Sequence, residues 1–148
     1  MSGDAIRLRF PARPEYLLLA RLAVAAVARR MALGRVEVGD LKLAVTEACS
    51  NAVRHAYAKG PPGEIALELL VDGDRLELVV EDRGAGIELP LREAAPPSES
   101  GGMGLRLIQA VVDDFAIGPG EDGTGTTVRM TKHAEPAGAV ARKREPEV

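Results

Sequence analysis

The sequence TEACSNAVRHAY, Thr46 to Tyr57, contains three polar residues at every fourth position: Glu47, Asn51 and His55. On an α-helix a step of four residues turns the side chain by only about 40°, so these three side chains lie along one stripe. The face beside the stripe is apolar and consists of Leu41, Ala44, Val45, Ala48, Ala52 and Ala56. The stripe either borders solvent on an ordinary amphipathic helix or faces a bound metal or nucleotide, because unpaired polar groups are costly to bury.

The composition predicts a single globular domain. The 148 residues are 46% apolar and 28% charged, which is enough for a buried core. A formal net charge of −3 and an aromatic content of 3% argue against a nucleic-acid partner. The one cysteine, Cys49, excludes an internal disulfide, and we interpret it as a small buried helix residue rather than a nucleophile.

The two ends of the sequence lead to expectations about location and domain bounds. The N-terminus has no signal-peptide layout, and no apolar run reaches about 18 residues, so we expect a cytoplasmic protein with no membrane contact. One domain is expected over residues 1–132. Residues 133–148 are rich in Ala, Pro and charge and are expected to form a solvated, disordered tail.

Hydrophobic periodicity predicts an α+β fold. Strands are expected at 5–10, 64–71, 75–81, 114–117 and 126–131, and helices at 14–33, 41–58 and 103–113. Gly34 is expected to end the first helix and Asp40 to cap the second. Residues 88–102 have no clear period and are interpreted as a lid. Hairpin-linked strands with helices grouped apart predict a two-layer sandwich, a mixed or antiparallel sheet covered on one face by helices.

An aspartate followed by glycines comes directly after the strand predicted at 75–81, in Asp82-Arg-Gly84-Ala-Gly86-Ile87. A carboxylate at a strand end can accept a hydrogen bond from an exocyclic amine, and glycines let the backbone approach a ligand closely. An ordinary Asp-Gly turn is the alternative interpretation.

Two further short patterns fit a nucleotide. Gly101-Gly102-Met103-Gly104-Leu105 leads into a helix, where free N–H groups and the positive end of the helix dipole favour phosphate. It is neither the dinucleotide fingerprint, because it follows a loop, nor a P-loop, because it lacks the lysine. Gly125-Thr126-Thr127-Val128 opens the last strand, and β-propensity alone could explain it.

Taken in order, these patterns resemble those of the GHKL nucleotide-binding superfamily. The segment from Glu47 to Tyr57 is similar to its N box, and the segment from Asp82 to Ile87 is similar to its first glycine box. Gly102–Leu105 resembles the second glycine box, and Gly125–Thr127 resembles the terminal GT element. The resemblance covers residues 6–132 and is closest to the bacterial anti-sigma-factor serine/threonine kinases of partner-switching systems.

The resemblance implies a function and its partners. It implies an anti-sigma factor that is also an ATP- and Mg²⁺-dependent serine kinase. Such a protein binds a sigma factor, phosphorylates a small anti-anti-sigma antagonist and is usually a homodimer. The alternative is a nucleotide-gated module that binds a sigma factor with little or no kinase activity.

The resemblance also implies roles for individual residues. Asn51 would ligate Mg²⁺, and Glu47 would be the catalytic base for the substrate serine. Asp82 would accept from the adenine amine with help from Thr126, and Arg21 on the first helix falls where the subfamily contacts its antagonist. The nucleotide-binding positions implied are Asn51, His55, Asp82, Gly84, Gly86, Gly102, Met103, Gly104, Leu105 and Thr126.

Overall fold

The structure is a computed structural model, and it describes residues 3–56, 63–83, 102–120 and 123–134. The strands are β1 (Asp4–Pro11), β2 (Glu64–Asp72), β3 (Arg75–Asp82), β4 (Asp114–Gly118) and β5 (Thr126–His133). The helices are α1 (Leu17–Arg30), α2 (Arg35–Asn51) and α3 (Gly102–Val111), with a short 3-10 helix at Pro14–Tyr16 and a π-helical turn at Ala52–Ala56.

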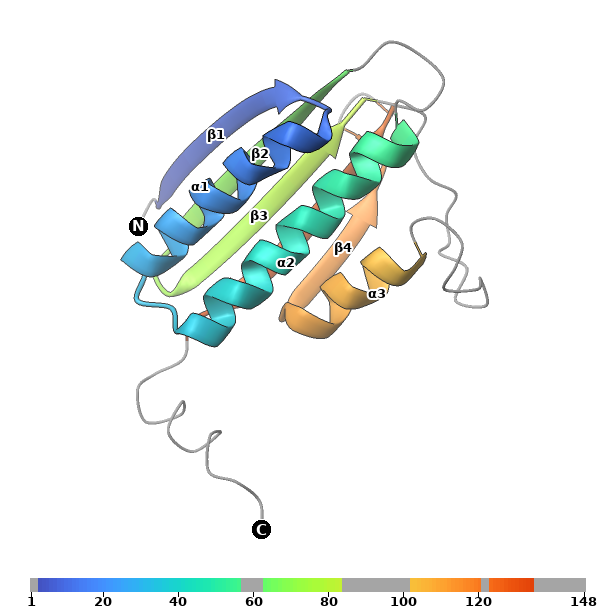
Figure 1. Cartoon of the computed structure of the whole chain (residues 1–148). Coiled ribbons are helices and arrows are strands. Elements are labelled where there is room, and N and C mark those ends of the chain that lie inside the picture. The colour runs from blue at the N-terminus through green and yellow to red at the C-terminus, as the bar shows by residue number, and fades with distance from the viewer. Residues whose placement is uncertain (1–2, 57–62, 84–101, 121–122, 135–148) are drawn as a thin grey trace.

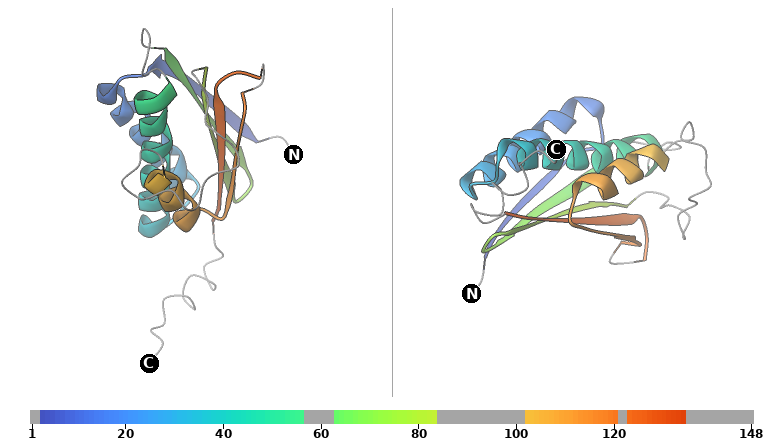
Figure 2. Two further views of the ribbon diagram at one scale, coloured as in Figure 1. Left: turned by 90° about the vertical axis from the view of Figure 1, so that its right-hand side faces the viewer. Right: turned by 90° about the horizontal axis from the view of Figure 1, so that it is seen from below.

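The strands form one sheet in the order β1-β2-β3-β5-β4, and every neighbouring pair is antiparallel. All three α-helices lie on the same face of this sheet (Figure 1), and the two side views show two layers (Figure 2). The two-layer α+β sandwich expected from the sequence is therefore confirmed.

The core lies between the sheet and the helices. Ile65, Leu67 and Leu69 alternate along β2 and are at most 1% exposed, as expected for a strand with one buried face. On α2 and the π-helical turn that follows it, the apolar face predicted from the sequence is buried in the part that the structure describes. Leu41, Ala44, Val45, Ala48 and Ala52 are at most 3% exposed.

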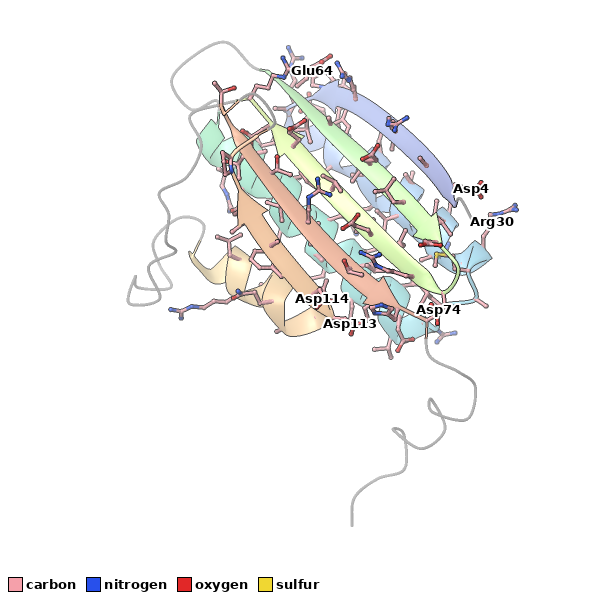
Figure 3. The ribbon with its side chains drawn as sticks, turned by 180° about the vertical axis from the view of Figure 1, so that it is seen from behind. Asp4, Arg30, Glu64, Asp74, Asp113 and Asp114 are labelled. Atoms are coloured by element: carbon pink, nitrogen blue, oxygen red, sulfur yellow. The ribbon has the colours of Figure 1, made fainter. Side chains whose placement is uncertain are left out.

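The other face of the sheet is polar (Figure 3). Arg7 Nε lies 2.6 Å from Glu68 Oε2 across the β1–β2 pair. Glu77 lies between Arg75 and Arg129, at 3.7 and 3.8 Å. Ion pairs this exposed contribute at most about 1 kcal/mol each to stability. This face therefore faces solvent and adds little to the stability of the core.

Two predictions about helix ends were wrong. Ala32, with φ of 61°, makes the left-handed turn expected at Gly34, and the N–H of Leu33 donates to the Ala28 carbonyl at 3.1 Å. Gly34 has an extended backbone and precedes α2, which begins at Arg35. Asp40 is thus inside α2 and not its cap, because the buried side chains of Val38 and Leu41 continue the helical spacing on both sides of it.

Candidate functional site

Glu47 and Asn51 lie one turn apart at the end of α2, and the start of α3 packs directly against them. A Cβ built on Gly104 would lie 3.0 Å from Glu47 Oε2 and 3.6 Å from both Asn51 Oδ1 and Asn51 Nδ2. Gly104 is buried, whereas both polar side chains are partly exposed. A larger residue at position 104 would push against the carboxylate, so glycine allows this close approach.

The start of α3 is chemically suited to anions. The first N–H groups of a helix have no partner within the helix, and the helix dipole places positive charge there. Glu47 and Asn51 therefore border a region that favours phosphate. The side chain of Leu105 is only 7% exposed, so this residue helps to seat α3 on the core.

Beyond Asn51 the helix continues as the π-helical turn Ala52–Ala56, a form often found at functional sites. In this turn the exposed Arg54 donates from Nη2 to Asn51 Oδ1 at 3.3 Å. Arg54 was not among the site residues predicted from the sequence. Its position three residues after Asn51 was the available signal, because residues at that spacing face each other on a helix.

Asp82 and Thr126 meet at the end of the sheet. They are direct cross-strand partners at the end of β3 and the start of β5, and they are 7% and 6% exposed. Asp82 continues the alternation of the buried Leu78 and Val80, so its side chain lies on the helix-covered face. The structure therefore brings together two residues that are 44 positions apart in the sequence and that were both expected to bind the adenine amine.

Gly125 is a second residue to which the sequence motifs assigned no individual role. Its φ is +71°, in the left-handed region, and a Cβ built on it would lie 1.9 Å from the Asp82 carbonyl oxygen. Only glycine fits both the backbone conformation and the space. Gly125 therefore lets β5 begin close enough to β3 to pair Thr126 with Asp82.

Four predicted site residues fall wholly or partly outside the described part of the chain. Gly84 and Gly86 lie outside the described residues, as do the side chains of His55 and Met103. Gly102 is the first residue of α3, so it is at the expected helix start. Arg21 is exposed on α1.

The donor atoms that the site offers are hard oxygens. Within the described ranges, no group of three or more His, Cys, Asp or Glu side chains could hold a metal ion by itself. The Asn51 carboxamide oxygen nevertheless fits Mg²⁺, which prefers oxygen and usually keeps waters and substrate phosphates as its other ligands. A magnesium ion here would therefore be shared between the protein and a bound phosphate chain.

Cys49 is a core residue, as predicted. It is fully buried on α2, and this burial raises the pKa of its thiol to about 12. A thiol with this pKa stays protonated at neutral pH, and the thiolate is the reactive form. Cys49 therefore takes no part in the chemistry of the site.

A hollow of about 340 Å³ lies on the uncovered face of the sheet, lined by Arg9, Gly63, Glu64, Ala66, Glu81 and Arg83. Arg9, Ala66 and Glu81 occupy one cross-strand row, opposite to the buried residues. This hollow is thus separated from Glu47 and Asn51 by the sheet itself.

The fold and the site define a nucleotide-binding α+β domain: helices on one face of an antiparallel sheet, a buried aspartate at a strand end, and a glycine at a helix start against a Glu–Asn pair. The sequence profile of the histidine kinase-like ATPase domain matches residues 10–132. The chain is 38% identical over 141 residues to the serine-protein kinase RsbW of Bacillus pumilus, covering 87% of this chain and 85% of that protein. It is also 38% identical over 140 residues to RsbW of Listeria monocytogenes, covering 88% and 87%. The chain therefore belongs to the histidine kinase-like ATPase family.

Solved structures agree with this fold. The RsbU and RsbW domains of Rv1364c from Mycobacterium tuberculosis match with a TM-score of 0.64 and 19% identity, over 88% of this chain and 32% of that one. The histidine kinase domain of the blue-light activated kinase EL346 from Erythrobacter litoralis matches with a TM-score of 0.56 and 23% identity, over 90% and 64%. These two likenesses bear on the fold alone.

Family membership confirms the enzyme class expected from the sequence, an ATP-dependent protein serine/threonine kinase of the GHKL type, since the curated relatives are serine-protein kinases. None of the helices in the described ranges has the length and apolar character needed to span a membrane.

Proposed function

We propose that this chain is an anti-sigma factor that binds a sigma factor and uses Mg-ATP to phosphorylate a serine on a small anti-anti-sigma protein. The observation that carries the proposal is the close approach of Gly104 to Glu47 and Asn51, which brings an anion-favouring helix start beside a carboxylate and a carboxamide. Extensive similarity to serine-protein kinases over at least 85% of their length supports it.

In this proposal the nucleotide lies between two groups of residues, Asp82 with Thr126 and Glu47 with Asn51. Both groups are at the end of the sheet where β3 and α2 end (Figure 1). The buried Asp82 carboxylate accepts from the adenine amine, and Thr126 assists it. The start of α3 would hold the phosphates, and Asn51 would ligate Mg²⁺. The metal neutralises phosphate charge when it is bound, and the Arg54 guanidinium beside Asn51 adds positive charge at the same place.

Glu47 is the proposed general base. Its carboxylate lies at the start of α3, where the terminal phosphate is expected, so it can orient the serine hydroxyl and accept its proton. Phosphoryl transfer depends mostly on positioning and charge neutralisation. The carboxylate is therefore expected to affect turnover more than nucleotide affinity.

Helix α1 is the proposed partner surface. Arg21 is exposed, and its neighbours Leu18 and Leu22 are 56% and 57% exposed on the same side of the helix. Exposed apolar side chains around a cation suit a protein contact. We assign the antagonist to this surface and propose that the kinase acts as a homodimer.

Replacing Glu47 by glutamine is expected to lower serine phosphorylation at least about 100-fold, because the amide keeps the shape of the carboxylate but cannot accept a proton. ATP affinity should change less than about threefold. The measurement is transfer of labelled phosphate from ATP to a small anti-anti-sigma protein from the same genome, and the antagonist with its acceptor serine changed to alanine is the control. ATP binding without any phosphoserine would favour the alternative, a nucleotide-gated module that sequesters a sigma factor.

Replacing Asp82 by asparagine is expected to lower ATP affinity about 10- to 100-fold, because the amide can present a donor to the adenine amine in place of an acceptor. Inosine triphosphate carries a carbonyl at that position, so its affinity should fall much less. Titration calorimetry with both nucleotides gives the ratio. If ADP and ATP bind the variant as tightly as the wild type, Asp82 does not contact adenine.

A further inference from the structure

Lys132 is a charged residue on the buried side of the sheet. It follows Val128 and Met130 on the inner face of β5 and pairs with the fully buried Leu76. Its side chain is only 14% exposed. A charge in such a place needs partners, because the loss of hydration is costly.

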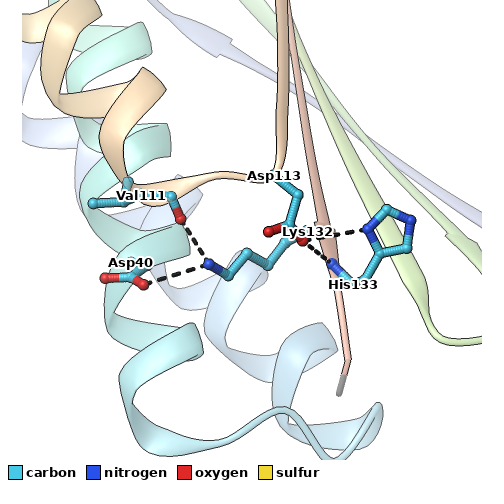
Figure 4. A network of polar contacts seen from close by, with 5 residues as sticks. All are labelled: Asp40, Val111, Asp113, Lys132 and His133. Atoms are coloured by element: carbon cyan, nitrogen blue, oxygen red, sulfur yellow. Dashed lines mark hydrogen bonds and ion pairs between the residues drawn. The ribbon is translucent and has the colours of Figure 1, made fainter. Parts of the chain in front are cut away.

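Those partners come from two helices (Figure 4). Lys132 Nζ donates to the Val111 carbonyl at 2.8 Å and lies 3.5 Å from Asp40 Oδ2. Val111 is the last residue of α3, where helix carbonyls have no partner within the helix and the dipole is negative. One ammonium group therefore connects the end of α3, the body of α2 and the edge of the core. We call Lys132, Asp40 and Val111 the Lys132 clamp.

The next residue of β5, His133, makes a second attachment, to Asp113. The backbone N–H of His133 donates to Asp113 Oδ2 at 2.7 Å, and its ring nitrogen lies 3.3 Å from that oxygen. Partial burial raises the pKa of Asp113, but the two hydrogen bonds from His133 and the charge of Lys132 outweigh it and leave the pKa below its usual value. The turn from α3 to β4 is thus fixed to the end of β5.

The clamp and the candidate site lie at opposite ends of one helix pair. Helices α2 and α3 pack side by side, and Asp40 lies at the end of α3 while Glu47 lies at its start, so the two helices are antiparallel. Asp40 and Glu47 are separated by about two helical turns, and so are Val111 and Gly104. Fixing the end of α3 against Asp40 therefore sets how far Gly104 reaches along α2.

We propose that Lys132 is a positioning residue for the nucleotide phosphates: the clamp holds α3 in the register that brings Gly104 against Glu47 and Asn51. This inference rests on the proposed phosphate site at the start of α3. It gives β5 two tasks, since its first residue, Thr126, pairs with the adenine-binding Asp82 and Lys132 near its end fixes the phosphate-binding helix.

The test compares two ligands on the full-length chain. In Lys132→Met, ATP affinity measured by calorimetry is expected to fall about tenfold, whereas adenosine affinity should stay unchanged because adenosine has no phosphates for α3 to bind. Lys132→Arg should restore most of the loss, since it keeps a cation near Val111 and Asp40. The readout is the ratio of ATP affinity to adenosine affinity. Measured well below the melting temperature, this ratio is not changed by a general loss of stability, because such a loss affects both ligands equally.

Arg129→Met is the matched control. Arg129 is on the same strand but faces solvent, 3.8 Å from Glu77, so this variant also removes one ion pair and should leave the ratio at its wild-type value. Should Lys132→Met fail to fold, Asp40→Asn loses only the ion pair and is expected to lower the ratio about threefold.

An unchanged ratio of ATP affinity to adenosine affinity in the folded clamp variants overturns the inference, whether both affinities are retained or both fall equally. Both results leave the proposed function intact as long as the wild type binds ATP. If the wild type binds ATP no more tightly than adenosine, the proposed function and the inference fail together.

Discussion

Replacing Asn51 by alanine is expected to abolish Mg²⁺-dependent nucleotide binding while the fold stays intact. The carboxamide faces the start of α3, and both of its terminal atoms lie 3.6 Å from a Cβ built on Gly104. Loss of the proposed metal ligand should lower ATP affinity in Mg²⁺ at least about 100-fold. Because Asn51 is only partly buried, its removal should cost little stability, and the melting temperature checks this.

Two controls make this result specific. Ser50→Ala removes a small polar side chain from the neighbouring position of α2, which is also partly buried, and should leave ATP affinity unchanged. Adenosine affinity should survive in Asn51→Ala, because Asp82 and Thr126 are untouched. If Asn51→Ala binds ATP in Mg²⁺ as tightly as the wild type does, the assignment of the N box is wrong.

The elements that the sequence predicted well are those with a strong hydrophobic period. The buried face of α2 follows from the spacing of Leu41, Val45 and Ala48, because an apolar face has only the core to pack against. Strands β2 and β3 follow from alternation and from the turn at Gly73, whose φ is +62°. Such signals are local and agree with the tertiary packing, so the sequence suffices to place them.

The helix ends were harder to predict because the partners of their residues can be distant in the sequence. Asp40 has the composition of a cap, but its carboxylate lies 3.5 Å from Lys132 Nζ on β5. Nothing near Asp40 in the sequence indicates that partner. Ala32 takes a left-handed backbone that usually favours glycine, at a cost of about 1–2 kcal/mol that the surrounding turn offsets.

The site shows the same division. The motifs grouped Asp82 with Thr126 around one ligand, and the two are cross-strand partners; the close approach of Gly104 to Glu47 was not predicted, and the roles of these residues stay predictions. Arg54 had a local signal in its spacing from Asn51 that was overlooked, whereas Lys132 had none, because its partners Asp40 and Val111 are distant in the sequence. Gly125 was part of a recognised pattern, but only the backbone angle and the distance to β3 explain it.

Replacing Gly125 by alanine is expected to have the largest effect on stability and adenine binding together. Two costs combine at this position. A left-handed backbone costs a non-glycine residue about 1–2 kcal/mol, and the new Cβ would meet the Asp82 carbonyl at 1.9 Å, a distance that forces β5 away from β3. The buried pair of Asp82 and Thr126 should then separate, with a loss of ATP affinity of at least about tenfold.

Gly73→Ala separates the two costs. Gly73 has a similar φ of +62°, but no atom of the described residues lies within 4 Å of its Cβ position, and it is in the hairpin turn at the other end of β3. This control should lose only the backbone term, about 1–2 kcal/mol in the free energy of unfolding by denaturant titration, and should bind ATP normally. Gly125→Ala should lose at least about twice as much. Equal losses in the two variants, with ATP affinity retained in both, would mean that the close approach of β5 to β3 does not build the adenine site.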